Sequence, residues 1–317
     1  MGIIDKHQRI FVAGHRGLVG SAIVRRLQAG GYLNLLVRTH EELDLCRQAD
    51  VEAFFASEPI DCVVLAAARV GGIHANNSRG GEFIRDNLLV QTNVIDAAHR
   101  NGVTRLIFLG SSCIYPRECP QPMREEHLMS SPLEPTNEPY AVAKIAGLKM
   151  CEAYNRQYVT RYLSLMPTNL YGPGDNFELS TSHVVPALIR KIHTAREKGE
   201  SSVTLWGSGS PMREFLHVDD LADACVFLME RDPQYSMINV GSGTEVSILE
   251  LAKTIAAVIG YEGSFELDTS MPDGTPRKLL DSGRLTSLGW SPRIDLATGL
   301  RDTYRWFVAQ GDEARLN

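Results

Sequence analysis

The feature that most constrains this fold is a short apolar run that ends in a cluster of glycines near the start of the chain. Ile10 to Ala13 are all apolar, and the residues that follow are Gly14-His15-Arg16-Gly17-Leu18-Val19-Gly20. Glycines in such a turn let the backbone bend tightly and approach a pyrophosphate, while a helix that begins there supplies unpaired amide hydrogens and a positive dipole end. The order of strand, glycine turn and helix predicts a dinucleotide-binding loop, although glycines also serve ordinary turns.

Alternating apolar runs and helical patterns continue as far as Met166. The later apolar runs are 33–37, 62–67, 106–109 and 163–166, and the helical patterns are 18–29, 49–56, 83–100 and 140–158. Strands that are apolar throughout are typical of parallel sheets covered by helices on both faces. The sequence therefore predicts an α/β fold with a Rossmann-type doubly wound parallel sheet. In the third helix one buried stripe with a single polar break is predicted from Ile84, Leu88, Gln91, Ile95 and Ala98.

After Met166 the pattern changes to shorter elements separated by turn formers. Tyr171 to Asp175 contain two glycines and a proline, and both residue types recur in 206–211 and 271–276. We expect residues 1–172 to form a cofactor-binding domain, with segments around 214–242 returning to it. Residues 173–317 are expected to form mainly a smaller substrate-binding lobe.

Composition excludes several classes of protein. A net charge of -6 over 317 residues argues against binding to nucleic acid or to a membrane surface. The longest apolar stretch, Cys62 to Ala68, is too short to span a bilayer, and the first ten residues contain no secretory signal pattern. The six cysteines lack zinc-type spacing, so we expect no metal and a reducing cytoplasm.

Arginines near the glycine turn predict the phosphorylated form of the cofactor. Arg38 stands at the end of the second predicted strand, where an NAD enzyme usually places a carboxylate, and Arg16 lies in the turn itself. Because a guanidinium suits a 2′-phosphate, we expect NADP(H). The alternative is that Arg38 is a surface side chain and that Glu41 or Glu42 binds the ribose. Further contacts to the cofactor are expected from Asp44, Leu45 and Ala67.

A tyrosine and a lysine four residues apart predict acid–base chemistry. Tyr140 and Lys144 lie one above the other on a helix face. A nearby lysine cation favours the phenolate and would lower the pKa of the tyrosine from its ordinary value of about 10. Ser111 and Ser112 follow the fourth strand, at the edge where such sheets bind ligands. Ser111 with the tyrosine and lysine therefore forms a candidate catalytic set, against the plainer interpretation of an amphipathic helix.

Two further segments resemble the extended short-chain dehydrogenase/reductase family. They are Pro167-Thr168-Asn169-Leu170-Tyr171-Gly172-Pro173 and Arg213-Glu214-Phe215-Leu216-His217-Val218-Asp219-Asp220. Members of this branch act on nucleotide-linked sugars, so the resemblance implies such a substrate for the smaller lobe.

Cys113 and His183 are candidates for a second kind of chemistry. Cys113 lies two residues beyond Ser111, and His183 begins the helix that enters the smaller lobe. Single cysteines and histidines more often have structural roles. On opposite faces of a keto sugar, however, a thiolate and an imidazolium could remove a proton alpha to the ketone and return one from the other side, which is epimerisation. A 4,6-dehydratase would carry an Asp-Glu pair where this chain has Cys113-Ile114.

Six segments taken together resemble the GDP-L-fucose synthase branch of that family. They are residues 14–20, 109–116, 133–140, 166–173, 206–209 and 272–280. The resemblance implies conversion of GDP-4-keto-6-deoxy-D-mannose to GDP-L-fucose. Cys113 would be the base and His183 the acid for inversion at C3 and C5. NADPH would then reduce C4 while Tyr140 protonates the oxygen, Lys144 tunes it and Ser111 orients it.

The same resemblance implies ligand contacts and an oligomeric state. The remaining cofactor contacts would be Leu109, Gly110, Ser111, Ser112, Tyr140, Lys144, Pro167, Thr168, Asn169, Leu170 and His183. The GDP-sugar substrate would be bound by Lys191, Trp206, Arg213 and Asp273, although Trp206 could instead pack between the lobes. A homodimer is expected through the helices that begin near Phe83 and Tyr140. The alternatives are another nucleotide-sugar epimerase or dehydratase of the family, and a non-catalytic NADP(H)-sensing protein.

Overall fold

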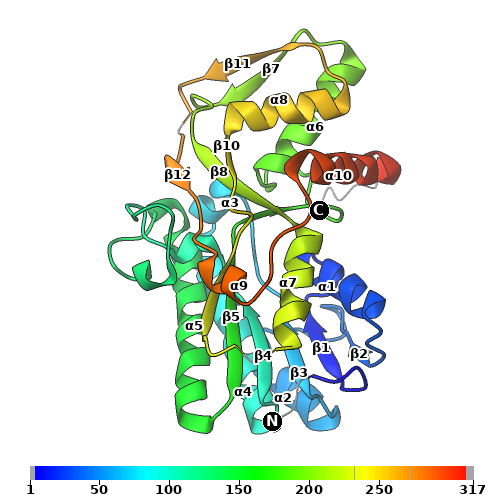
Figure 1. The fold of residues 1–317 in the computed structure, drawn as a ribbon, viewed down its shortest axis with the longest axis vertical. Coiled ribbons are helices and arrows are strands. Elements are labelled where there is room, and N and C mark those ends of the chain that lie inside the picture. Colours follow the sequence, from blue (N-terminus) through cyan, green and yellow to red (C-terminus); the bar gives the residue numbers. More distant parts are fainter. Residues whose placement is uncertain (1–3, 232, 272, 312–317) are drawn as a thin grey trace.

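Six parallel strands form the central sheet of the larger lobe, in the order β2-β1-β3-β4-β5-β9 (Figure 1). The computed structural model describes residues 4–231, 233–271 and 273–311. The strands are β1 Ile10–Ala13, β2 Leu35–Leu36, β3 Cys62–Leu65, β4 Arg105–Leu109, β5 Arg161–Pro167 and β9 Met237–Val240. The chain builds outward from β1 first to one side and then to the other, so the predicted doubly wound α/β fold is confirmed.

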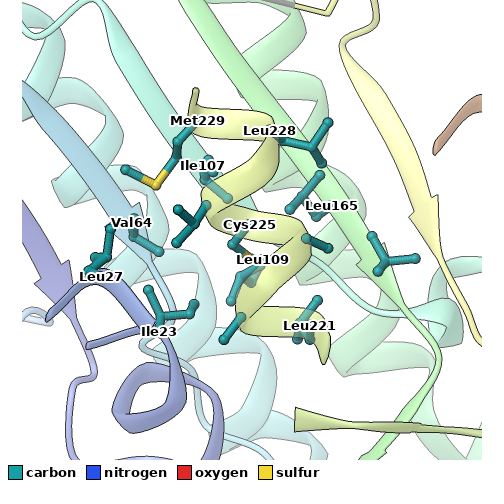
Figure 2. Packing of buried hydrophobic residues seen from close by; sticks show 14 of the residues in the cluster. Ile23, Leu27, Val64, Ile107, Leu109, Leu165, Leu221, Cys225, Leu228 and Met229 are labelled. Carbon is teal, nitrogen blue, oxygen red and sulfur yellow. The ribbon is translucent and has the colours of Figure 1, made fainter. Parts of the chain in front are cut away.

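Helices cover both faces of this sheet, which explains why its strands are apolar throughout. One face carries α1 Leu18–Ala29 and α7 Val218–Met229, and the other carries α2 Gln48–Ser57, α4 Gly80–Arg100 and α5 Glu138–Tyr158. Side chains alternate along β1: Ile10 and Val12 join one core, while Phe11 joins the other. Figure 2 shows the first core, in which Leu221 and Cys225 of α7 lie over the sheet.

The observed helices and strands agree with the predicted ones, except where contacts with distant segments set the length of a strand or the buried face of a helix. β1 and α1 have the predicted bounds, whereas the run 33–37 forms only the two-residue strand β2, and Leu33 is exposed. The predicted stripe on α4 is wrong in its first two turns. There Phe83 and Asn87 are buried, whereas Ile84 and Leu88 are only half-buried. Asn87 tolerates burial because its amide is hydrogen bonded to the main chain of the loop before α3.

The smaller lobe is built from two short sheets and three longer helices (Figure 1). Its strands are β6 Asn169–Tyr171, β8 Met212–His217, β10 Glu245–Ser247 and β12 Arg277–Lys278 in one sheet, and β7 Ser202–Trp206 and β11 Ser264–Asp268 in the other. Its helices are α6 Val184–Lys198, α8 Ile248–Ile259 and α10 Leu296–Gln310. A separate apolar core, centred on residues such as Ile189, Leu205 and Ile255, lies among them.

The described part of the chain also contains short helical elements. They are the helices α3 Ile73–Ser78 and α9 Gly283–Ser287, and the 3-10 turns η1 Ser112–Ile114, η2 Glu125–His127 and η3 Pro135–Asn137. α7 and β9 return to the large sheet after β8 has contributed to the small one. The division into domains at residue 172 stays a prediction. Within the described part of the chain, no helix is both long and apolar enough to cross a bilayer.

Candidate active site

The glycine turn is packed so tightly that it forms a cradle at the start of α1. Gly14 has a φ of 86°, and a Cβ there would lie 2.7 Å from the Ala67 nitrogen. A Cβ on Gly20 would lie 2.1 Å from the Gly14 oxygen, whereas one on Gly17 would make an ordinary contact of 3.4 Å. Gly17 is also the N-cap of α1 and provides no side-chain cap for its first amides. The cradle and these amides fit a dinucleotide pyrophosphate.

Arg38 lies beside the glycine turn but already has an acidic partner. Its guanidinium donates a hydrogen bond to Glu58 at 2.8 Å, and the same carboxylate accepts a second one from Arg9 at 2.6 Å. Arg38 is also 5.2 Å from the centroid of the Phe54 ring. A 2′-phosphate would therefore have to share this arginine with Glu58. The alternative ribose ligand Glu42 is occupied in its own turn, where it accepts the Thr39 amide at 2.7 Å.

The other predicted adenine-side residues are near the same edge. The Asp44 carboxylate accepts the amide of Cys46 at 2.9 Å, and Leu45 packs on the core beneath α4. Ala67 is half-buried directly after β3 and against Gly14. The structure thus places Ala67 against the glycine turn, while Asp44 and Leu45 lie in the segment between β2 and α2, and their contact with a cofactor stays a prediction.

Tyr140, Lys144 and Ser111 are brought together where β4 ends against α5. Tyr140 is hydrogen bonded to the Ser111 side chain. The Lys144 Nζ donates to the Leu109 oxygen at 2.9 Å and lies 5.9 Å from the centroid of the Tyr140 ring. Lys144 is fully enclosed, with 3% of its side chain exposed, and burial lowers its pKa to about 8. The lysine is therefore held by main chain, at the end of the strand that carries the serine.

The pKa of Tyr140 is raised, so the prediction that it would lie below its ordinary value is wrong for this structure. Burial raises the pKa of the phenol, the neighbouring Cys113 raises it further, and the hydrogen bond to Ser111 lowers it. Burial dominates because a phenolate loses most of its hydration in this position. Tyr140 is thus protonated at neutral pH, which suits a group that gives a proton to a ketone oxygen as the ketone is reduced.

Cys113 lies on the same turn and touches the same tyrosine. Ser111 caps η1 by accepting the Cys113 amide at 3.2 Å. The half-buried thiol packs in a small cluster with Ala75, Phe83 and Tyr140. It is also close enough to Arg213 to influence the pKa of that guanidinium. One 3-10 turn therefore holds both a hydroxyl and a thiol against Tyr140.

His183 comes to this region from the smaller lobe as the N-cap of α6. The residue is exposed, and desolvation by the protein around it lowers the pKa of its imidazole. The residues just before it contact α3: the Gly72 amide donates to the Thr181 oxygen at 3.0 Å. Because α3 also carries Ala75 of the Cys113 cluster, the thiol and the imidazole flank the same short helix.

The four predicted GDP-side residues lie on separate elements of the smaller lobe. The Lys191 Nζ is 4.8 Å from the ring centroid of Trp206, and 59% of Trp206 is exposed, so the interpretation of Trp206 as lobe packing is wrong. Arg213 is half-buried and interacts electrostatically with Cys113 and Asp273. Asp273 accepts the amide of Ser208 at 2.6 Å, which fixes the turn after Trp206. Arg213 thus connects the GDP side to the thiol.

Residues just after β5 and at the start of β6 form hydrogen bonds at the junction between the lobes. Thr168 and Asn169 both donate to the Glu214 oxygen, at 3.2 and 2.8 Å. The buried Glu214 carboxylate accepts the amides of Gly243 and Leu280 at 2.7 and 3.0 Å. Gly110 is needed beneath this junction because a Cβ there would lie 2.3 Å from the Met166 sulfur. Leu109, Pro167 and Leu170 line the neighbouring strand ends, and Ser112 is buried in η1.

Sequence reasoning missed Lys278. It lies on β12 directly opposite Arg213 of β8 in a parallel pair, so both side chains leave the same face of the sheet. Lys278 and Ser112 also line one small pocket between the lobes. Only strand register reveals this pairing of cations, because the two residues are far apart in the chain. A larger cavity of about 350 Å³ lies where β3, β4 and β5 begin, at the opposite end of the sheet from these residues.

Comparisons with known proteins agree with this geometry. The model of the NAD dependent epimerase/dehydratase family matches residues 10–241, from β1 past β9. "GDP-L-fucose synthase 1" of Arabidopsis thaliana is 59% identical over 304 residues, which cover 96% of this chain and 94% of that protein. "GDP-L-fucose synthase" of Escherichia coli is 56% identical over 317 residues, covering 97% and 99% of the two chains.

The chain belongs to the NAD dependent epimerase/dehydratase family, in its GDP-L-fucose synthase branch. A solved structure of a GDP-L-fucose synthetase from Naegleria fowleri bound to NADP has a TM-score of 0.90 and 27% identity to it, with 99% of this chain and 96% of that chain covered.

Proposed function

We propose that this protein converts GDP-4-keto-6-deoxy-D-mannose to GDP-L-fucose by inversion at C3 and C5 followed by NADPH-dependent reduction at C4. The observation that carries the proposal is the packing of Cys113 against the cluster that contains Tyr140. A base for removing a proton alpha to a ketone and an acid for protonating the ketone oxygen thereby share one site. Relatives that are 56% and 59% identical over nearly the whole chain carry this function in their names.

In the inversion steps Cys113 and His183 act from opposite faces of the sugar. As thiolate, Cys113 takes the proton from the carbon next to the ketone, and the electron pair of the C–H bond moves into the enolate. His183 then gives a proton to the other face of that carbon. C3 and C5 both flank the C4 ketone, so the same enolising group activates both. Protonated Tyr140 donates a hydrogen bond to the ketone oxygen and stabilises the enolate charge.

In the reduction step the protein supplies the proton and the orientation. NADPH, when bound, supplies the hydride for C4, and the glycine cradle with Arg16 and Arg38 would hold it. Tyr140 transfers its proton to the C4 oxygen as the alcohol forms, and the Ser111 hydroxyl hydrogen bonds to the same oxygen. Lys144, held by the Leu109 carbonyl, places a positive charge below the phenol and stabilises the phenolate that remains. The raised pKa of Tyr140 favours this direction of transfer.

The GDP part of the substrate binds on the smaller lobe. Arg213 and Lys278 offer two cations from neighbouring strands to the diphosphate, and Lys191 adds a third beside the exposed Trp206 ring. The Trp206 ring presents an apolar face for a ribose or base. Asp273 sets the turn that presents the ring and offers a carboxylate to hydroxyl or base-edge donors.

The alternatives can be weighed against single residues. A simple epimerase or dehydratase of the family would not need a thiol on η1 together with a histidine at the N-cap of α6. A binding protein that only senses NADP(H) would not need the Ser111, Tyr140 and Lys144 set to be intact. The combination supports the epimerase-reductase.

We also propose that the protein is a cytoplasmic homodimer. All six cysteines are unpaired thiols, in keeping with a reducing compartment. Helices α4 and α5 pack side by side, and each leaves an apolar side chain exposed, Leu89 and Val142. A second copy of the same pair would cover these faces as a four-helix bundle. Light scattering that gave the mass of a single chain would contradict this part of the proposal.

The test of the function is a reaction in deuterated water with NADPH and GDP-4-keto-6-deoxy-D-mannose. We expect one NADPH to be oxidised for each sugar, with deuterium at C3 and C5 and the L-galacto configuration in the product. UDP- and dTDP-linked keto sugars serve as controls for the nucleotide. A product reduced at C4 without inversion, or preferential turnover of another keto sugar, would contradict the proposal.

A further inference from the structure

The two lobes meet at α3, beside both candidate epimerase residues. On one side of this helix Ala75 packs with Phe83, Tyr140 and Cys113. On another side Gly72, the N-cap of α3, donates its amide to the Thr181 oxygen at 3.0 Å, two residues before His183. α3 is thus in contact with the turn that carries the thiol and with the loop that carries the imidazole.

The contact with the His183 loop is made by main chain on both sides. A Cβ on Gly72 would lie 2.7 Å from the Ser182 oxygen, closer than real Cβ atoms approach a carbonyl. The loop is rigid on its own side as well, because the amides of Thr181 and Ser182 donate to the Glu178 oxygen at 3.0 and 2.7 Å. Main chain cannot rotate away as a side chain can, so the position of Gly72 sets the position of His183.

Asn76 fixes Gly72. Its side chain is buried, with 8% exposed, and its Nδ2 donates to the Gly71 oxygen at 2.6 Å and to the Gly72 oxygen at 3.1 Å. On the other side of the same loop, Asn87 of α4 accepts the Arg69 amide at 3.1 Å and donates to the Arg69 oxygen at 3.0 Å. The Asn76 amide group therefore donates both of its hydrogen bonds to the turn that contacts the His183 loop.

We infer that Asn76 is a positioning residue for inversion: it holds the Gly71–Gly72 turn so that His183 faces the sugar carbon from the side opposite Cys113. The inference rests on the proposed function. Its chemical consequence follows from the proton balance. The Cys113 thiolate removes the proton of the C–H bond and becomes a thiol, and the enolate must then accept a proton. If His183 is displaced, the thiol returns a proton to the original face, so hydrogen exchanges with solvent and the configuration stays unchanged.

The test compares exchange with inversion in Asn76→Ala and Gly72→Ala. Each variant is incubated in deuterated water with substrate and NADPH, and NMR of the products gives deuterium content and configuration at C3 and C5. We expect the ratio of exchange to inversion to rise by about 10-fold or more in both variants, because misplacing a reacting group by about 1 Å costs up to about 100-fold in rate. The dissociation constant for NADPH is expected to stay within about twofold of the wild type, since neither residue touches the glycine cradle.

Asn101→Ala is the matched control. Its Nδ2 also donates to a main-chain carbonyl, that of Ala97 at 2.8 Å, but at the far end of α4. This variant should keep the wild-type ratio. The inference is overturned if Asn76→Ala and Gly72→Ala bind NADPH normally and keep the wild-type ratio, or if both lose exchange, inversion, reduction and NADPH binding together. A wild-type enzyme that reduces the substrate without exchange overturns the proposed function itself, and the inference with it.

Discussion

The two halves of the candidate site hold their residues in different ways. Ser111, Cys113, Tyr140 and Lys144 lie where β4 meets α5; Tyr140 and Lys144 are buried, Ser111 and Cys113 are half-buried, and hydrogen bonds and packing join them to one another or to main chain. The GDP-side residues stand on separate parts of the smaller lobe and are half-buried or exposed: Lys191 and Trp206 contact each other, and Asp273 accepts the nearby Ser208 amide. Proton and hydride transfer require positions fixed within about 0.5 Å, whereas a diphosphate can be met by side chains that adjust. Substitutions in the first half should change rates, and those in the second should change affinity.

Replacing the thiol should have the largest effect. Cys113→Ser puts a hydroxyl in place of the thiol, and a serine hydroxyl forms almost no anion at neutral pH. Deuterium incorporation at C3 and C5 should fall by about 1000-fold or more, as measured by NMR. Cys119→Ser, a half-buried cysteine farther along the same segment, is the control and should behave as the wild type. Normal exchange in Cys113→Ser would remove this residue as the base.

Removing the phenol should slow reduction and spare part of the exchange. Tyr140→Phe deletes the proton donor for the C4 oxygen, and loss of a general acid costs about 100- to 10,000-fold. NADPH oxidation followed by absorbance should fall by that factor, while deuterium exchange should fall much less, since Cys113 is still present. Tyr154→Phe on the same helix, which loses a hydrogen bond to Asp96, serves as the control. Equal loss of both activities would contradict a specific role of Tyr140 as the proton donor in reduction.

Alanine substitutions at two glycines of the same turn should have very different effects on NADPH affinity. Gly20→Ala forces its Cβ to within 2.1 Å of the Gly14 oxygen, so the turn must open, whereas Gly17→Ala creates a contact of only 3.4 Å. We expect the NADPH dissociation constant to rise about 10- to 100-fold in the first variant and to stay within about threefold in the second. Fluorescence titration measures both. Equal affinities would show that the turn is not the pyrophosphate site.

Raising the pH should slow reduction before it affects the tyrosine itself. Burial lowers the pKa of Lys144 to about 8, so the ammonium loses its proton above that pH, while the raised pKa keeps Tyr140 protonated. The rate of NADPH oxidation should therefore fall by up to about tenfold for each pH unit above 8. Lys144→Met should be slow at every pH and lack this limb. A rate that is flat between pH 7 and 9 would contradict the role of the cation.

A loss of affinity without a loss of rate is expected on the GDP side. Trp206→Ala removes the exposed ring beside Lys191 and should raise KM for the GDP-sugar by about 3- to 10-fold with kcat unchanged. Leu267→Ala, an exposed apolar side chain on the paired strand β11, is the control. A change in kcat instead of KM would contradict the view that the GDP-side residues contribute to affinity and not to rate.

Local sequence patterns were sufficient to predict much of the fold and several residues of the candidate site. Continuous apolar runs gave the parallel strands, the glycine spacing gave the cradle, and the four-residue spacing gave Tyr140 and Lys144. These features depend on backbone sterics and on periods of 2 and 3.6 residues, which any short segment carries in itself. The buried face of α4 was not predictable in this way, because Asn87 is buried only by virtue of a loop that packs on it.

The sequence by itself determined the fold class, and it predicted the cofactor loop and the candidate reacting groups. The tertiary structure alone decided that burial keeps Tyr140 protonated, that Arg38 is hydrogen bonded to Glu58, that Lys278 stands beside Arg213, and that Gly72 joins the start of α3 to the loop before His183. The reason is physical. A pKa, an ion pair or a strand register depends on atoms contributed by distant segments, and these meet only when the chain is folded.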